Sequence, residues 1–115
     1  MDSILTSIKK LLGIQEDYTH FDTDIIIHVN SALMILNQLG VGPLGGFSIV
    51  DSSTTWDEFI PEDDKNFEAA KTYVYMKVKL IFDPPSSSAV IESMNRIISE
   101  IEWRLTVQHD AAQST

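Results

Sequence analysis

Hydrophobic side chains recur at helical spacing in four stretches of the chain, at about residues 3–12, 21–40, 65–82 and 88–107. Ser3 stands where it can cap the first stretch, and Gly13 ends it. Asp22 or Thr23 can accept hydrogen bonds from the free amides that begin the second stretch, which Gly40 ends. The apolar stripe of this second helix is wide enough to contact two neighbours, so we expect it at the centre of the fold. The pattern therefore predicts an all-α domain with four main helices.

The segment between the second and third helices, residues 41–61, is rich in glycine and proline and has no helical pattern. Residues 47–50 have the composition of a short strand or hairpin arm. Thr55 and Glu58 stand at the spacing of a capping box, before a single helical turn that Pro61 stops. We therefore expect a long, partly extended loop between helices 2 and 3, which packs on another surface through its apolar side chains.

The chain turns sharply between the last two helices, at Asp83, Pro84 and Pro85. A proline disfavours helical backbone at the residue before it, so Pro84 acts on Asp83 and Pro85 acts on Pro84. The serines that follow offer N-caps for the last helix. The pair of prolines predicts a rigid corner rather than a slack linker. We expect a single helical domain at residues 1–108 and a flexible C-terminal tail at residues 109–115.

Charge is distributed unevenly along the sequence, whose formal net charge is −9. No lysine or arginine lies between Lys10 and Lys65, and that interval contains ten acidic residues. From Lys65 to Arg104 the positive and negative side chains nearly balance. This asymmetry fits an acidic side that meets a basic partner or the basic side of a neighbouring copy, and it fits a merely solvated surface equally well.

Few residues are arranged for catalysis or for metal binding. The absence of cysteine excludes disulfides, thiolate nucleophiles and cysteine-based zinc sites. Asp24 and His28 share a helix face, but the helix N-terminus explains Asp24 better, and no metal-binding signature surrounds them. The glycine-rich segment 40–46 lacks the lysine and hydroxyl of a phosphate-binding loop. Lysines mixed with Tyr73 and Tyr75 are too few to indicate DNA binding in so acidic a chain. We therefore expect no enzyme activity, no catalytic or metal site and no cofactor.

The N-terminal segment MDSILTSIKKLLG has an early acid and no basic n-region. Its apolar run is too short for a signal peptide or a membrane span. We therefore expect a soluble intracellular protein without a membrane partner.

Several stretches, in this order, resemble one protein family. They are SIKKLLGI with an acidic linker, FDTDIIIHVNSALMILNQLGVGP, TTWDEFIP and, above all, AAKTYVYMKVKLIFDPPSSSAVIESMNRIISEIEWRL. Over about residues 3–105 the chain resembles the head-tail connector, or adaptor, proteins of long-tailed bacteriophages, which are also described as DNA-packaging proteins.

The resemblance implies a non-enzymatic virion protein whose copies form a homo-oligomeric ring, expected to be a dodecamer. Such a ring docks beneath the phage portal protein and contacts a stopper or tail-completion protein on its other side. It extends the channel through which DNA passes without sequence-specific binding. The implied location is the head-tail interface of the virion, with the host cytoplasm as the site of assembly.

Three groups of residues are expected to carry this function. The candidates for a subunit interface combine the loop with one part of the third helix: Leu44, Phe47, Ile49, Trp56, Phe59, Tyr73, Met76, Lys77, Lys79 and Leu80. The structural corner comprises Asp83, Pro84 and Pro85. The candidates for contact with the portal lie near the end of the last helix: Trp103, Arg104 and His109. The alternative is an acidic helical interaction module that binds a basic partner or mimics DNA, and an enzyme with Asp24 and His28 in a deep pocket comes third.

Overall fold

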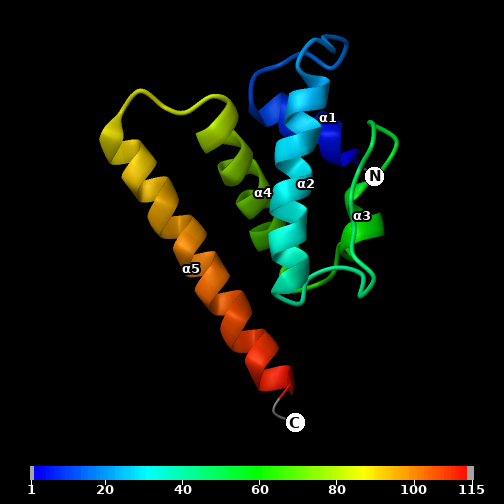
Figure 1. The fold of residues 1–115 in the computed structure, drawn as a ribbon, viewed down its shortest axis with the longest axis vertical. Coiled ribbons are helices and arrows are strands. Elements are labelled where there is room, and N and C mark those ends of the chain that lie inside the picture. The colour runs from blue at the N-terminus through cyan, green and yellow to red at the C-terminus, as the bar shows by residue number, and fades with distance from the viewer. Residues whose placement is uncertain (1, 114–115) are drawn as a thin grey trace.

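Helices make up the regular structure of residues 2–113, which are the residues that this computed structural model describes. They are α1 (Ile4–Leu11), α2 (Asp22–Gln38), α3 (Trp56–Phe59), α4 (Phe67–Phe82) and α5 (Ser88–Gln113). The central pair is α2 and α4, and α1 packs on both of them (Figure 1). The expected all-α fold and the central position of the second helix are thus confirmed.

The core lies where α1, α2 and α4 meet. The hydroxyl of Ser3 accepts a hydrogen bond from the backbone N–H of Thr6 at 3.1 Å, so α1 begins with the predicted cap. Fully buried apolar side chains come from all three helices: Ile4, Leu5, Ile8, Ile25, Val29, Leu33, Leu36, Ala70, Val74 and Val78. Each large apolar side chain in such a position contributes about 1.5–3 kcal/mol through burial. These three helices therefore supply most of the hydrophobic stabilisation.

The N-terminus of α2 differs from the prediction. Phe21 occupies the cap position and makes no side-chain capping bond, so the expected capping by Asp22 or Thr23 is wrong. Asp22 instead forms an ion pair with Lys9 of α1, at 2.8 Å between Nζ and Oδ1. The carboxylate is drawn toward a buried cation, because an unpaired charge in the core is more costly than an uncapped helix amide.

The C-terminus of α2 agrees with the prediction. Gly40 adopts a φ of +92°, which side chains with a Cβ rarely tolerate. Its N–H donates to the carbonyl of Asn37, and the N–H of Val41 donates to the carbonyl of Leu36. These two bonds form a Schellman motif, which satisfies carbonyls that would otherwise be free at the helix end.

Within residues 39–54, the loop after α2 contains no strand. Within the described residues, 47–50 have no ladder partner, so the expected strand or hairpin arm is wrong. The side chain of Asn30 takes the place of a neighbouring strand: its Nδ2 donates to the carbonyl of Ile49 at 2.9 Å, and its Oδ1 accepts from the N–H of Ile49 at 2.8 Å. The side-chain amide of Asn30 thereby makes the same pair of hydrogen bonds that a residue in a neighbouring antiparallel strand would make.

The single turn α3 is attached to the start of the chain. The carboxylate of Glu58 accepts from the N–H of Thr55 at 2.8 Å in the predicted capping box. Trp56 is buried, and its indole N–H donates to the hydroxyl of Ser7 at 2.7 Å. The loop is therefore held to α1 as well as to α2.

The corner between the last two helices lies where the sequence predicts it, since α4 ends at Phe82 and α5 begins at Ser88. Asp83 pairs with Lys79 at 3.0 Å across the last turn of α4. The ring of Phe82 meets that of Phe21 edge to face, with centroids 5.2 Å apart. These contacts attach the corner to the core.

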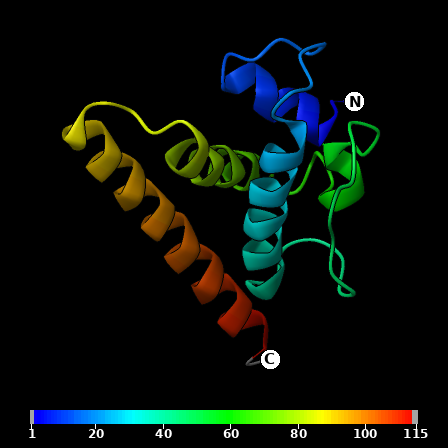
Figure 2. The same ribbon diagram turned by 45° about the horizontal axis from the view of Figure 1, so that its top comes forward.

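The last helix is longer than predicted. It continues past Val107 to Gln113, and His109 is half buried against Gly40 at the end of α2. In Figures 1 and 2 the last turns of α5 come close to the end of α2, while its first turns lie apart from the core. The contact with α2 explains why helix persists beyond the apolar stripe. Residues 114 and 115 of the expected tail lie outside the described residues, and a domain boundary at residue 108 stays a prediction.

Candidate functional site

The loop candidates for a subunit interface divide into buried and exposed side chains. Ile49, Trp56 and Phe59 are buried in the core of the protomer itself. Phe47 is half buried on Phe59, with ring centroids 5.1 Å apart. Leu44 is fully exposed. In this conformation the three buried side chains anchor the loop, and Leu44 is the candidate most accessible to a neighbour.

Two asparagines on α2 position this loop, and sequence reasoning missed them. Asn30 holds the backbone of Ile49 as described above, and Nδ2 of Asn37 donates to the carbonyls of Val41 at 3.2 Å and Pro43 at 2.6 Å. Residues seven apart lie on the same flank of a helix. Two asparagines at that spacing beside an apolar stripe are a signal that could have indicated a docked loop.

The α4 candidates lie largely on the face that α5 covers. Tyr73 is fully buried, and its hydroxyl donates to Oε2 of Glu102 on α5 at 2.6 Å. Burial raises the pKa of the Tyr73 hydroxyl well above its usual range, and the hydrogen bond to Glu102 raises this pKa further. Met76 and Leu80 follow Tyr73 on the same helix face and are partly buried. The expected surplus of apolar surface on α4 is therefore covered in part by α5.

The two lysine candidates of α4 interact within the protomer. Lys79 forms the ion pair with Asp83 that spans the end of the helix. The ammonium group of Lys77 lies 6.0 Å from the centroid of the Tyr73 ring. Both side chains are partly exposed, so a neighbour can still reach them.

The three candidates for portal contact do not form one surface. Trp103 is 66% exposed, and Arg104 is exposed and pairs with Glu100 at 2.7 Å. His109 instead faces the end of α2, where a Cβ on Gly40 would lie 2.5 Å from its Nδ1. A hollow of about 280 Å³ adjoins this part of α5, and its lining comprises Lys65, Asn66, Ala69, Ile101, Arg104, Leu105 and Gln108.

A buried lysine is the second feature that sequence reasoning missed. Lys9 is almost fully buried, and its ammonium group contacts Asp22 and donates to the carbonyl of Glu16 at 3.0 Å. These contacts join α1, the following linker and α2. On a helix Lys9 lies between Leu5 and Leu12, so its position within the apolar face was the available signal.

The described residues offer little for metal chemistry or membrane insertion. Across residues 2–113, no three or more His, Asp or Glu side chains converge on a position that could hold a metal ion. Asp24 is exposed and His28 is partly buried on α2. In the same part of the chain, no helix has the length and apolar character that crossing a membrane requires.

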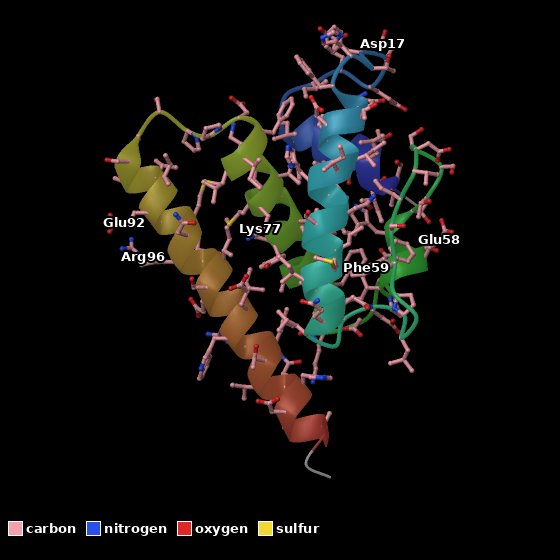
Figure 3. The ribbon with its side chains drawn as sticks, viewed as in Figure 1. Asp17, Glu58, Phe59, Lys77, Glu92 and Arg96 are labelled. Carbon is pink, nitrogen blue, oxygen red and sulfur yellow. The ribbon has the colours of Figure 1, made fainter. Side chains whose placement is uncertain are left out.

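Charged side chains project outward at two opposite edges of the protomer (Figure 3). Glu92 and Arg96 point away from α5 on one side, and Glu58 points away from α3 on the other. The guanidinium group of Arg96 donates to the hydroxyl of Ser93 at 3.3 Å. Within residues 2–113, neither Arg96 nor Glu58 forms an ion pair. Each edge therefore presents charge that the protomer does not neutralise by pairing.

Comparison with known proteins identifies one family. The sequence model of the Phage connector protein family matches residues 4–112, which includes α1 to α4 and nearly all of α5. Searches of curated proteins and of solved structures returned no match. The extent of the family match confirms the resemblance that the sequence motifs indicate. The chain therefore belongs to the Phage connector protein family and is a structural component of a bacteriophage virion.

Proposed function

We propose that this chain is the subunit of a ring-shaped adaptor at the head-tail interface of the virion. Copies of the chain close into a ring, expected to be a dodecamer, that docks beneath the portal protein. The ring extends the DNA channel toward the tail and contacts a stopper or tail-completion protein on its other side. Assembly takes place in the host cytoplasm. The family match over residues 4–112 is the observation that carries this proposal.

The construction of the protomer supports a structural role. Its core is apolar, its loop is fixed by Asn30 and Asn37, and its corner is attached to the core through Phe82. A ring subunit has to present the same surfaces in every copy, because each interface is repeated around the ring. A protomer whose loop and corner are fixed meets this requirement without reorganising on assembly.

The acidic surface supports a channel that DNA can traverse. The acids between Lys10 and Lys65 are exposed except for Asp22, which is partly buried: Glu16, Asp17, Asp24, Asp51, Asp57, Glu58, Glu62, Asp63 and Asp64. Proteins that hold DNA neutralise its phosphates with lysine and arginine. In the proposed ring, a channel wall formed by acids of this set outside the subunit contacts, such as Glu16, Asp17 and Asp24, repels phosphate and leaves the DNA free to move.

We place the portal contact on the C-terminal half of α5. Trp103 exposes a large amphipathic ring, and such side chains are enriched among residues that dominate binding energy. Arg104 lies beside it and also lines the hollow next to α4. In this proposal Trp103 and Arg104 meet the portal, while His109 supports the helix end from within the protomer.

The test is native mass measurement of the full chain at several concentrations, with and without the portal protein of the same phage. The expected result is a closed cyclic oligomer, or a symmetric set of copies bound to the portal. Trp103→Ala should weaken portal binding, while Ile27→Ala, an exposed apolar side chain on α2, serves as the control outside the proposed contact. A chain that stays monomeric and does not bind the portal protein at any concentration would contradict the proposal. That result would favour the alternative, an acidic helical interaction module that binds a basic partner.

A further inference from the structure

We infer that neighbouring copies in the ring meet head to tail, with the first half of α5 in one copy against the loop and α3 of the next. This inference rests on the proposed ring and specifies its contact. The α5 edge is defined here as the exposed side chains of residues 90–97, and the loop edge as the exposed side chains of residues 44–58. The occupant of each edge is therefore a second copy of this chain.

The placement of the two edges is the first argument. The protomer measures 47 × 35 × 21 Å, and in Figure 1 α5 lies on one side of the central pair while the loop and α3 lie on the other. A ring closed by rotation uses two different, complementary surfaces on each subunit. Those surfaces have to lie on opposite sides, because every copy contacts one neighbour on each side. The two edges meet this condition.

Exposed apolar side chains are the second argument. Val90 and Ile97 are 46% and 40% exposed and lie seven residues apart, so they share a stripe of α5 at the margin of its buried face, next to Met94. On the loop edge, Leu44 is fully exposed and Val50 is 80% exposed. Single exposed apolar side chains are ordinary, but here a pair lies on each of two opposite edges. Contact between these edges removes both pairs from water.

Charge complementarity is the third argument. Glu92 and Arg96 both project from the α5 edge, so its formal charges balance, and Arg96 has no ion pair among the described residues. The loop edge carries Asp51, Asp57 and Glu58, and no lysine or arginine lies within residues 44–58. A contact between two loop edges would oppose these acids to one another, which is unfavourable. A contact between unlike edges instead sets these acids against an edge whose charges balance and lets them pair with Arg96, so charge favours the head-to-tail arrangement over contact between like edges.

The absence of cysteine permits a direct test by crosslinking. Ser52→Cys places a thiol on the loop edge and Ser99→Cys places one on α5 three residues after Arg96, next to the α5 edge, and both serines are exposed. The full chain carrying both changes should give a ladder of covalent oligomers with a short bis-maleimide reagent. Each single variant should stay uncrosslinked, because unlike edges meet and two identical thiols never face each other.

A charge exchange tests the same contact independently. Arg96→Glu should raise the concentration needed for ring assembly by about tenfold or more, since like charges then face each other. Adding Asp57→Lys should restore assembly toward the wild-type concentration. Circular dichroism melting of each variant shows that the protomer is folded, and Glu92→Lys serves as a control because it adds positive charge to the α5 edge and should not weaken assembly.

The outcomes separate the inference from the proposed function. If the wild-type ring forms but the single cysteine variants crosslink and the double variant gives no ladder, the head-to-tail contact is wrong while the ring stands. If Arg96→Glu assembles as well as wild type, the proposed pairing of Arg96 with the acids of the loop edge is wrong, while the ring still stands. If the wild-type chain forms no ring in any condition, the proposed function fails and this inference fails with it.

Discussion

The two long helices that follow the loop, α4 and α5, stand in contrasting surroundings. Buried apolar side chains recur along α4, which packs on α2 and α1. On α5 the buried side chains are Met94, Ile98 and Leu105, and polar contacts such as Tyr73 to Glu102 and Asn66 to Gln108 complete its attachment. The difference indicates that α4 is committed to the core of the fold, whereas α5 retains an exposed outward face.

The two tryptophans give the sharpest test of this contrast. Trp56 is 2% exposed and Trp103 is 66% exposed. Trp56→Ala should lower the free energy of unfolding by about 3–5 kcal/mol, because it leaves a cavity and frees the hydroxyl of Ser7. Trp103→Ala should lower it by no more than about 0.5 kcal/mol. Urea denaturation of the isolated chain measures both values, and equal losses would contradict the division between core and outward face.

The buried ion pair should give the next largest effect. Asp22→Asn removes the charge that Lys9 faces and leaves a nearly buried ammonium without a counter-ion. We expect a loss of about 3 kcal/mol in the free energy of unfolding. Asp24→Asn, an exposed acid in the same helical turn, is the control and should cost less than about 1 kcal/mol. Similar losses in the free energy of unfolding for the two variants would contradict this expectation and show that water hydrates the Lys9 ammonium group once Asp22 is replaced.

Removing the side-chain amide of Asn30 should weaken the attachment of the loop to α2. Asn30→Ala leaves the N–H and carbonyl of Ile49 unpaired, so we expect a loss of about 2 kcal/mol. Hydrogen exchange at the Ile49 amide should accelerate more than exchange in α4, because the opening is local. Gln38→Ala changes an exposed polar side chain on the same helix and should leave that amide protected. Unchanged exchange at Ile49 in the Asn30 variant would mean that the apolar anchors hold the loop alone.

The attachment of α5 should show the smallest effect and a dependence on pH. Tyr73→Phe removes the bond to Glu102 and should cost about 1.5 kcal/mol near neutral pH. Because the pKa of Tyr73 is raised in the folded chain, its contribution is present below the unfolded pKa of about 10 and is lost as pH rises above it. The stability difference between wild type and Tyr73→Phe should therefore shrink in alkaline solution. A difference that persists well above that pH would contradict the assignment.

Features that depend on neighbouring residues could be predicted from the sequence. Ser3 caps α1, Gly40 ends α2, Thr55 and Glu58 form the capping box, and the prolines separate α4 from α5. In each case the interacting groups lie within a few residues of one another. The physical rule therefore acts on the sequence directly.

Features that depend on distant contacts could not be predicted. The strand expected at residues 47–50 is absent, and the side chain of Asn30 on α2 takes the N–H and carbonyl of Ile49 that a neighbouring strand would have bonded. The capping role expected of Asp22 gives way to its pairing with Lys9. The apolar loop residues looked alike as interface candidates, yet Ile49 is buried and Leu44 is fully exposed. Periodicity shows which side chains are apolar but not which surface of the molecule will cover them.

The unequal exposure of the two tryptophans also makes the chain its own optical reporter. Trp56 lies in apolar surroundings and Trp103 faces water, so their fluorescence spectra should differ without any added dye. Unfolding should move the emission of Trp56 to longer wavelength, whereas burial of Trp103 under a partner should move its emission to shorter wavelength. Opposite spectral shifts would thus distinguish loss of the fold from docking in one unlabelled sample.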